Sequence, residues 1–175
     1  LLPGTKILSG SAESLPFENQ SLDSIVVAQA FHWFNAESAL NEIHRVLKPN
    51  GKLGLIWNVR DESISWVREL TRIIDPYESG APRYKTMNWK KAFDSTLFFS
   101  KLEYLNFSYT QIGHIETVVD RVGSISFISA LPHETKTQVL QKVRELVHTH
   151  PETSGLSEIK IPYRTDVFWC ERNHI

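Results

Sequence analysis

The chain has 175 residues, of which 41% are hydrophobic and 22% charged, as is ordinary for one globular domain with a good core. Its formal net charge of −1 at pH 7 gives no electrostatic reason to expect nucleic acid or an anionic membrane as a partner. No apolar run approaches the roughly 20 residues that span a bilayer, so we expect no membrane partner.

The first third of the chain predicts strands alternating with a helix. The run from Ile25 to Ala28 is apolar and rich in β-branched residues, as in a strand buried on both faces. Asn35 can cap the helix that follows, and Pro49-Asn50-Gly51 ends it, with Gly51 supplying a positive φ if the turn needs one. The predicted elements are a short strand at 6–9, a loop at 14–22, a strand at 23–28, a helix at 36–47 and a strand at 52–59.

The remainder predicts helices between two further strands. Apolar residues at helical spacing indicate a helix at 63–75 and another from Pro132 to about His148. Between them we expect a loop at 76–88, a helical turn at 89–93, a strand at 102–111 and two short helices within 115–131, split near Gly123. A last strand at 158–170 alternates at period two, with one side formed by Ile159, Ile161, Tyr163, Thr165, Val167 and Trp169.

Two clusters of aromatic and polar residues each follow a predicted strand. Gln29 to Phe34 follows the first buried strand, and Trp57, Asn58 and Arg60 follow the second. Open α/β sheets bind ligands at the carboxyl edge of their strands. The sequence therefore predicts that both clusters lie at one ligand-binding edge.

Three segments of the sequence carry a resemblance to a known family, namely Gly10 to Phe17, Gln29 to Phe34 and Arg45 to Lys52. They resemble class I S-adenosylmethionine-dependent methyltransferases of the small-molecule, type 11 kind. Gly10 to Phe17 resembles the segment after the family's third strand, and Gln29 to Phe34 resembles its fourth strand and following loop. Arg45 to Lys52 resembles the turn before its fifth strand, and weaker resemblance continues through 56–62 and 162–165. The resemblance implies an α/β fold, a three-layer Rossmann-like and mostly parallel sheet with an antiparallel C-terminal hairpin.

The sequence departs from the family at its start. The family begins with a strand, a glycine-rich loop, a helix and a strand ending in an acidic residue, and no Gly-x-Gly-x-x-Gly occurs here. At about 30 residues per βαβ unit, the difference is roughly 60–80 residues. We therefore expect residues 1–175 to be a single partial methyltransferase domain, with N-terminal strands and helices missing and a helical insertion at about 112–156. We expect this fragment to be inactive alone and to form homo-oligomers through exposed sheet edges.

The resemblance also implies S-adenosylmethionine as the cofactor. It places Ser11, Ala12 and Glu13 near the adenine, and Gln29 and Ala30 beside the methionine part, although 11–13 could equally be a solvated loop. A methyl sulfonium carries its own leaving group, so such a site must align the acceptor and exclude water, and it needs no protein nucleophile.

Residues for a small-molecule acceptor follow from their chemistry. His32 is a candidate catalytic base for a hydroxyl or amine acceptor, with pocket lining or simple packing as alternatives. A carboxylic acid needs no base, because its oxygen is already anionic, and an arginine could hold it unless that arginine is a surface ion-pair partner. The proposed acceptor-binding residues are Trp33, Trp57, Asn58, Arg60, Tyr163 and Arg164, with Arg83 and Tyr84 as a further pair.

The histidines and the single cysteine bear on metal binding and on location. The histidines at 114, 133, 148 and 150 form no metal-binding spacing with carboxylates, so we predict no metal. Cys170 is the only cysteine, which rules out an intramolecular disulfide and fits a cytoplasmic location. The alternatives are a non-catalytic truncated interaction module and a nucleotide-binding oxidoreductase-like domain, which would share the strand–helix rhythm but not these motifs.

Overall fold

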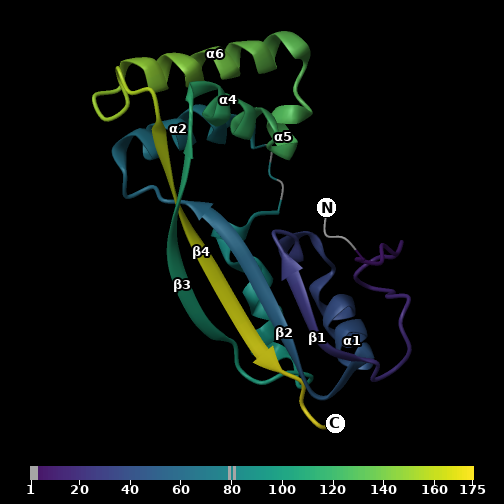
Figure 1. Ribbon diagram of the computed structural model, residues 1–175. Helices are drawn as coiled ribbons and strands as arrows, with labels where there is room; N and C mark the ends of the chain where they lie inside the picture. Colours follow the sequence, from purple (N-terminus) through teal and green to yellow (C-terminus); the bar gives the residue numbers. More distant parts are fainter. Residues whose placement is uncertain (1–3, 79, 81) are drawn as a thin grey trace. The chain divides into compact units, whose positions relative to one another are not determined.

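A computed structural model describes residues 4–78, 80 and 82–175, and its strands form a mixed four-stranded sheet in the order β1-β2-β4-β3 (Figure 1). β1 and β2 are parallel, as the resemblance implied, and Val27 lies beside Leu55. β4 runs antiparallel to β2, because the backbone N–H of Asp61 donates to Pro162 O and that of Arg172 donates to Gly51 O. The α/β fold class is therefore confirmed. The strands are β1 (Leu22–Ala28), β2 (Leu47–Arg60), β3 (Glu103–Gly113) and β4 (Ile159–Glu171).

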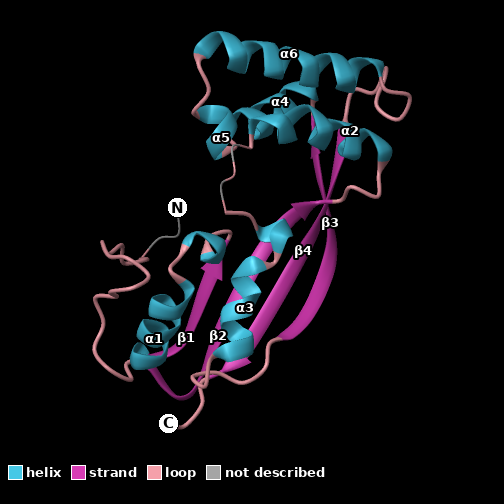
Figure 2. Cartoon of the chain, turned by 180° about the vertical axis from the view of Figure 1, so that it is seen from behind, coloured by secondary structure: helices cyan, strands magenta, loops and turns pink. Residues whose placement is uncertain are grey.

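The main helices lie within two residues of their predicted bounds, and Figure 2 shows the helices in cyan. The Asn35 side chain accepts from the Ser38 N–H at 3.2 Å and so caps the first helix. The predicted split near Gly123 is confirmed, because α4 ends there. The α-helices are α1 (Ala36–Val46), α2 (Ser65–Ile74), α3 (Lys91–Ser95), α4 (Ile115–Gly123), α5 (Ser126–Ser129) and α6 (His133–Thr149), and the 3-10 helices are η1 (Phe31–Trp33), η2 (Asp75–Tyr77), η3 (Tyr84–Thr86) and η4 (Asn88–Lys90).

The chain divides into two compact units, each with its own hydrophobic core. Unit 1 takes Leu1–Trp57, Pro82–Asn106 and Asp166–Ile175, and unit 2 takes Asn58–Ala81 and Phe107–Thr165. The core of unit 1 includes Phe31, Leu40, Leu53, Leu55, Trp57 and Phe168, and that of unit 2 includes Val67, Leu70, Val118, Val139, Val143 and Ile161. Helices α4, α5 and α6 fall inside the interval proposed as an insertion, and the single-domain organisation stays a prediction.

Two local predictions near the sheet are wrong. Residues 6–9 form no strand, and Ile7 is 85% exposed, because no described strand pairs with this segment. The turn at 49–51 lies inside β2, and Asn50, with φ of 62°, supplies the positive φ. Gly51 is needed for space instead, since a Cβ there would lie 2.8 Å from Lys48 O.

The predicted alternation of the last strand is wrong in its second half. Ile159, Ile161 and Tyr163 are buried as expected, but the pattern then shifts by one residue. Asp166, Phe168 and Cys170 are buried in place of Val167 and Trp169. Asp166 can take a buried position because two tyrosine hydroxyls donate hydrogen bonds to its carboxylate. Its burial accompanies the shift of the pattern by one residue.

Candidate functional site

A cavity of about 500 Å³ lies beside β1 in unit 1. Three of the residues expected to contact the cofactor line it, namely Ser11, Ala12 and Ala30. Its remaining walls are mostly apolar and include Phe17, Val26 and Phe34. The prediction that this strand is buried on both faces is wrong, because Val26 is 61% exposed and presents an apolar surface to the cavity.

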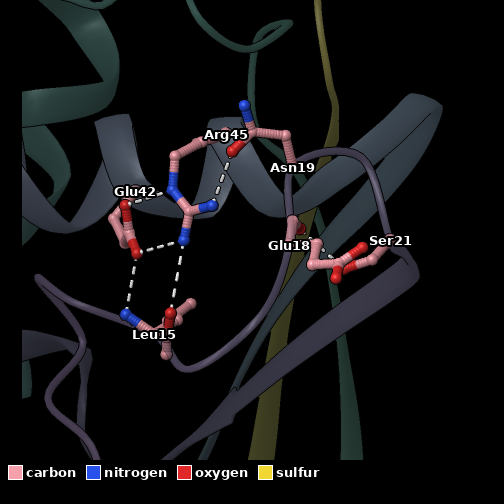
Figure 3. A network of polar contacts seen from close by, with 6 residues as sticks. All are labelled: Leu15, Glu18, Asn19, Ser21, Glu42 and Arg45. Atoms are coloured by element: carbon pink, nitrogen blue, oxygen red, sulfur yellow. Dashed lines mark hydrogen bonds and ion pairs between the residues drawn. The ribbon is translucent and has the colours of Figure 1, made fainter.

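The loop that forms one wall of the cavity is tied to α1 by a charged pair (Figure 3). Arg45 donates through Nε and Nη2 to the two carboxylate oxygens of Glu42, at 2.8 and 2.7 Å, and through Nη1 to Asn19 Oδ1 at 2.7 Å. Glu42 in turn accepts from the Leu15 N–H at 2.7 Å. The hydrogen bonds from Arg45 lower the pKa of Glu42, so its carboxylate stays charged and the loop stays anchored.

Glu13 makes a second attachment of the same loop. Its carboxylate accepts from the backbone N–H of Asn35 at 3.1 Å, and Asn35 is the residue that caps α1. Ser11 and Ala12, which line the cavity, are therefore followed directly by a residue fixed to the start of a helix.

Gln29 has strained backbone geometry at the end of β1. Its φ is 58°, and its N–H donates to Ile56 O at 2.9 Å. The left-handed region costs an ordinary residue about 1–2 kcal/mol, and such strain is concentrated at functional sites. A glutamine in the sequence does not indicate a positive φ. The sequence therefore predicted the position of Gln29 but not its backbone strain.

His32 and Trp57 are joined by a hydrogen bond. The Trp57 indole N–H donates to Nδ1 of His32 at 3.2 Å. Trp57 is only 1% exposed, whereas Trp33, whose ring centre lies 5.3 Å from that of His32, is 50% exposed. Burial, followed by the positive charge of Arg83, lowers the pKa of His32. The imidazole is therefore held neutral beside an aromatic group.

A buried carboxylate that sequence reasoning missed lies in the same unit. Asp166 is 0% exposed and accepts from the hydroxyls of Tyr84 at 2.6 Å and Tyr104 at 2.7 Å. The Tyr84 ring stacks on Trp57, with centres 4.7 Å apart. The one available signal was an aspartate beside the aromatic and apolar run at 167–170.

The remaining acceptor candidates lie in unit 2. Thr165 donates to Asn58 Oδ1 at 2.7 Å, and Tyr163 is 9% exposed with the Arg121 guanidinium 5.5 Å from its ring centre. Arg60 is half-buried and Arg164 exposed. The structure thus brings Ser11, Ala12 and Ala30 together at the cavity and His32 together with Trp57, while Asn58, Arg60, Tyr163 and Arg164 belong to the other unit.

Unit 2 also contains a serine, a histidine and a glutamate in contact. The Glu152 N–H donates to Nδ1 of His150 at 3.1 Å, so the proton of a neutral ring is on Nε2, which lies 3.1 Å from the Ser65 hydroxyl. The Ser65 hydroxyl donates to Glu152 at 2.6 Å. To activate the serine, the histidine would have to accept its proton, and here Nε2 carries a proton of its own. The arrangement therefore does not activate a nucleophile, and it links α2 to the loop after α6.

The described residues hold neither a metal-binding cluster nor a helix that could cross a bilayer. Within 4–78, 80 and 82–175, no group of three or more His, Cys, Asp or Glu side chains could hold a metal ion. Across the same part of the chain, every helix is too short or too polar to cross a bilayer.

Comparison with known proteins identifies the family. A family model described as a methyltransferase domain matches residues 2–55. The chain is 38% identical over 170 residues to an uncharacterized methyltransferase-like protein of Schizosaccharomyces pombe, covering 97% of this chain and 66% of that one. It is 33% identical over 174 residues to a second uncharacterized methyltransferase of that yeast, covering 97% of this chain and 67% of the relative. The chain belongs to the class I S-adenosylmethionine-dependent methyltransferases.

Further relatives support the same family. An uncharacterized methyltransferase of Mycobacterium tuberculosis is 37% identical over 164 residues, covering 94% of this chain and 64% of its own length. The first relatives are therefore longer, and the chain spans 64–66% of their lengths. A solved protein of Anaeromyxobacter dehalogenans, described as a type II methyltransferase, matches with a TM-score of 0.64 at 17% identity, covering 98% of this chain and 72% of that one. At that identity the likeness shows the fold alone.

The cavity beside β1 lies in the part of the chain that the family model matches. Every residue that lines it lies within residues 2–55, the stretch matched to the methyltransferase domain. The comparisons do not favour the interaction-module and oxidoreductase-like alternatives.

Proposed function

We propose that this chain takes part in S-adenosylmethionine-dependent methyl transfer to a small-molecule acceptor, and that the cavity beside β1 is part of the donor's site. The observation that carries the proposal is the confinement of the cavity lining to the segment matched by the methyltransferase model. Its volume of about 500 Å³ and its apolar walls suit part of a cofactor with a flat aromatic base.

The residues present fit such a donor. Ser11 offers a hydroxyl among apolar walls, where it would pair with a polar edge of the adenine, and Ala12 leaves room beside it. We assign Glu13 to the same end, and Gln29 and Ala30 to the methionine end. The bound donor would supply an activated methyl group on a sulfonium. The chain's own contribution is to orient the two reactants and exclude water.

For the acceptor we propose a small carboxylic acid. Its oxygen is anionic at neutral pH, so it needs positioning and no base. Within unit 1, Arg83 is proposed to bind the carboxylate and the half-exposed Trp33 to contact the rest of the acceptor. Asn58, Arg60, Tyr163 and Arg164 belong to unit 2 and stay sequence predictions. His32 is proposed to contact the reacting group.

We further propose that this stretch alone does not catalyse the reaction. It spans about two thirds of its relatives, and β1 is at an edge of the four-stranded sheet. Exposed edges pair readily, so we infer that the isolated chain associates with copies of itself. The single cysteine supports a cytoplasmic location.

Calorimetric titration tests the proposal. S-adenosylmethionine and NAD would be titrated separately into this chain and into a longer form that carries the family's N-terminal strand–loop–helix segments. We expect S-adenosylmethionine to bind the longer form only. NAD binding to either form, or no S-adenosylmethionine binding to a folded longer form, would contradict the proposal.

A substitution in the cavity locates the site. Ala12→Trp in the longer form would fill the cavity and abolish donor binding. The matched control is Ala130→Trp, because Ala130 is exposed in unit 2. If Ala12→Trp still binds the donor with unchanged affinity, the donor is bound elsewhere.

A further inference from the structure

The contact between Trp57 and His32 fixes which nitrogen of the imidazole carries a proton. We propose that Trp57 is a positioning residue that holds His32 as its Nε2–H tautomer, so that His32 donates a hydrogen bond to the acceptor and does not act as a base. The tautomer rests on geometry alone. The role toward the acceptor rests on the proposed methyl transfer.

The direction of the hydrogen bond is unambiguous. An indole N–H can only donate, and Nε1 of Trp57 lies 3.2 Å from Nδ1 of His32. Nδ1 must therefore present its lone pair to the indole. A neutral imidazole has a single N–H, so that proton is on Nε2.

Trp57 is fixed firmly enough to impose this choice. Its side chain is 1% exposed, and its ring centre lies 4.7 Å from that of Tyr84 and 4.6 Å from that of Trp89. Moving the proton to Nδ1 would set two donors against each other inside this aromatic cluster, and an unsatisfied buried donor is costly. The packing of Trp57 thus opposes the other tautomer.

The charges nearby act in the same direction. Burial lowers the pKa of His32, and the positive charge of Arg83 lowers it further. A neutral ring keeps its lone pair on Nδ1 and its only proton on Nε2.

Nε2 of His32 is then the atom available to a ligand. No described residue is recorded in a hydrogen bond with it. An N–H at that position suits an acceptor that already carries an anionic oxygen. A hydroxyl or amine acceptor would instead need a lone pair there to take its proton.

This reasoning favours the carboxylate among the two acceptor chemistries. A carboxylate oxygen already holds the electron pair that forms the new O–C bond while the C–S bond of a methyl sulfonium breaks. The electron pair of the broken C–S bond remains on sulfur, and no proton has to leave the acceptor. His32 would orient the carboxylate through Nε2–H without changing its own protonation.

Nitrogen NMR of the histidine rings tests the tautomer without any ligand. In uniformly ¹⁵N-labelled protein at pH 8, we expect His32 to show a lone-pair Nδ1 and a protonated Nε2. His114 is the internal reference of opposite kind, because its Nδ1 lies 2.7 Å from the Ser157 carbonyl oxygen and must donate to it. A protonated Nδ1 on His32 would overturn the proposal, whatever the variants do.

Two variants separate positioning from packing. Trp57→Phe removes the indole N–H, so His32 should become a mixture of tautomers. Trp89→Phe disturbs the same cluster but leaves the Trp57 N–H in place, so His32 should keep its wild-type signature. A tautomer that changes equally in both folded variants would mean that Trp57 acts only through packing. If Trp57→Phe does not fold, the wild-type spectrum alone decides.

The role toward the acceptor is tested in the longer, donor-binding form with a panel of small carboxylic acids. His32→Gln retains an N–H donor and should keep KM within about threefold of wild type, whereas His32→Leu should raise KM about tenfold or more. Loss of kcat in both variants with KM unchanged would indicate a base and contradict the donor role. Failure of the proposed function itself would appear differently, as absent donor binding with an intact Nε2–H signature.

Discussion

Arg45 and Glu42 form a forked ion pair one turn apart on α1, with two hydrogen bonds of 2.8 and 2.7 Å (Figure 3). The same carboxylate accepts the Leu15 N–H, so one side chain joins the helix to the loop that walls the cavity. The stability of that wall therefore depends on a charge carried by Glu42.

Glu42→Gln should lower the thermal midpoint by a few degrees near neutral pH, because an amide can replace only part of the fork. The pKa of Glu42 is lowered in the folded protein, so its stabilising contribution is complete above the unfolded value of about 4.3. That contribution is lost as pH falls through the folded pKa. Thermal unfolding from pH 3 to 7 should show that the difference in midpoint between wild type and variant becomes smaller as the pH falls.

The control for that series is Glu69→Gln, because Glu69 is exposed on α2. It should leave the midpoint nearly unchanged at every pH. If the difference in midpoint between wild type and Glu42→Gln is as large at pH 3 as at pH 7, the charge of Glu42 does not have the role assigned to it.

The strained backbone of Gln29 gives a second prediction. Gln29→Gly should be neutral or up to about 1 kcal/mol more stable, since glycine accepts a φ of 58° without strain. Gln29→Val should cost about 1–2 kcal/mol, because a β-branched residue resists that region. The same pair at Gln111 in β3 should give the opposite order. Urea denaturation measures both series, and identical rankings at the two positions would refute the strain.

The elements that the sequence predicted well depend on local information. The run at 25–28, the cap at Asn35 and the helical spacing at 133–148 each contain their own signal, and the structure has β1, α1 and α6 there. The segment at 6–9 failed because a strand also needs a neighbour. The phase of β4 failed because it is set by side chains from elsewhere in the chain.

The site was harder to predict than the fold for the same reason. Trp57 and His32 are 25 residues apart, and Asp166 is 82 residues from Tyr84 and 62 from Tyr104. No spacing rule links such positions. Sequence patterns could place Gln29 and His32 after a strand, but they could not give the direction of a hydrogen bond.

The buried carboxylate predicts a measurable role for a tyrosine hydroxyl. Tyr84→Phe removes a donor to Asp166, which is 0% exposed, and should cost about 1–3 kcal/mol of unfolding free energy. Tyr109→Phe is the matched control, because Tyr109 is 57% exposed on β3, and it should change stability by less than about 0.5 kcal/mol. Equal effects in urea denaturation would argue against a stabilising contact at Asp166.

Cys170 should behave as an inert thiol. It is 1% exposed, and burial raises its pKa to about 12, so hardly any reactive thiolate forms at pH 8. An aromatic disulfide reagent should therefore label the protein only after denaturation. Ser108→Cys introduces an exposed thiol on β3 that should react at once in the native state and so confirms the reagent. Rapid native labelling of wild type would show that β4 is not packed as described.

The histidine beside Trp57 gives the last prediction, a dependence of stability on pH. Burial and then Arg83 lower the pKa of His32 below the unfolded value of about 6.5. Above that pH neither state holds the proton, and His32 contributes nothing to the pH dependence. As pH falls below it, the unfolded chain takes up a proton first, so stability decreases until the folded pKa is passed.

His32→Gln should therefore lose less stability than wild type between pH 7 and 5, and Arg83→Gln should raise the pKa of the His32 ring. Proton NMR titration measures that pKa directly, and thermal unfolding measures the stability. His44 adds a similar dependence in every variant, because burial lowers its pKa as well, so His32→Gln removes only part of the slope. A His32 ring that titrates at or above 6.5 would contradict both the neutral imidazole and the hydrogen bond that Trp57 donates to it.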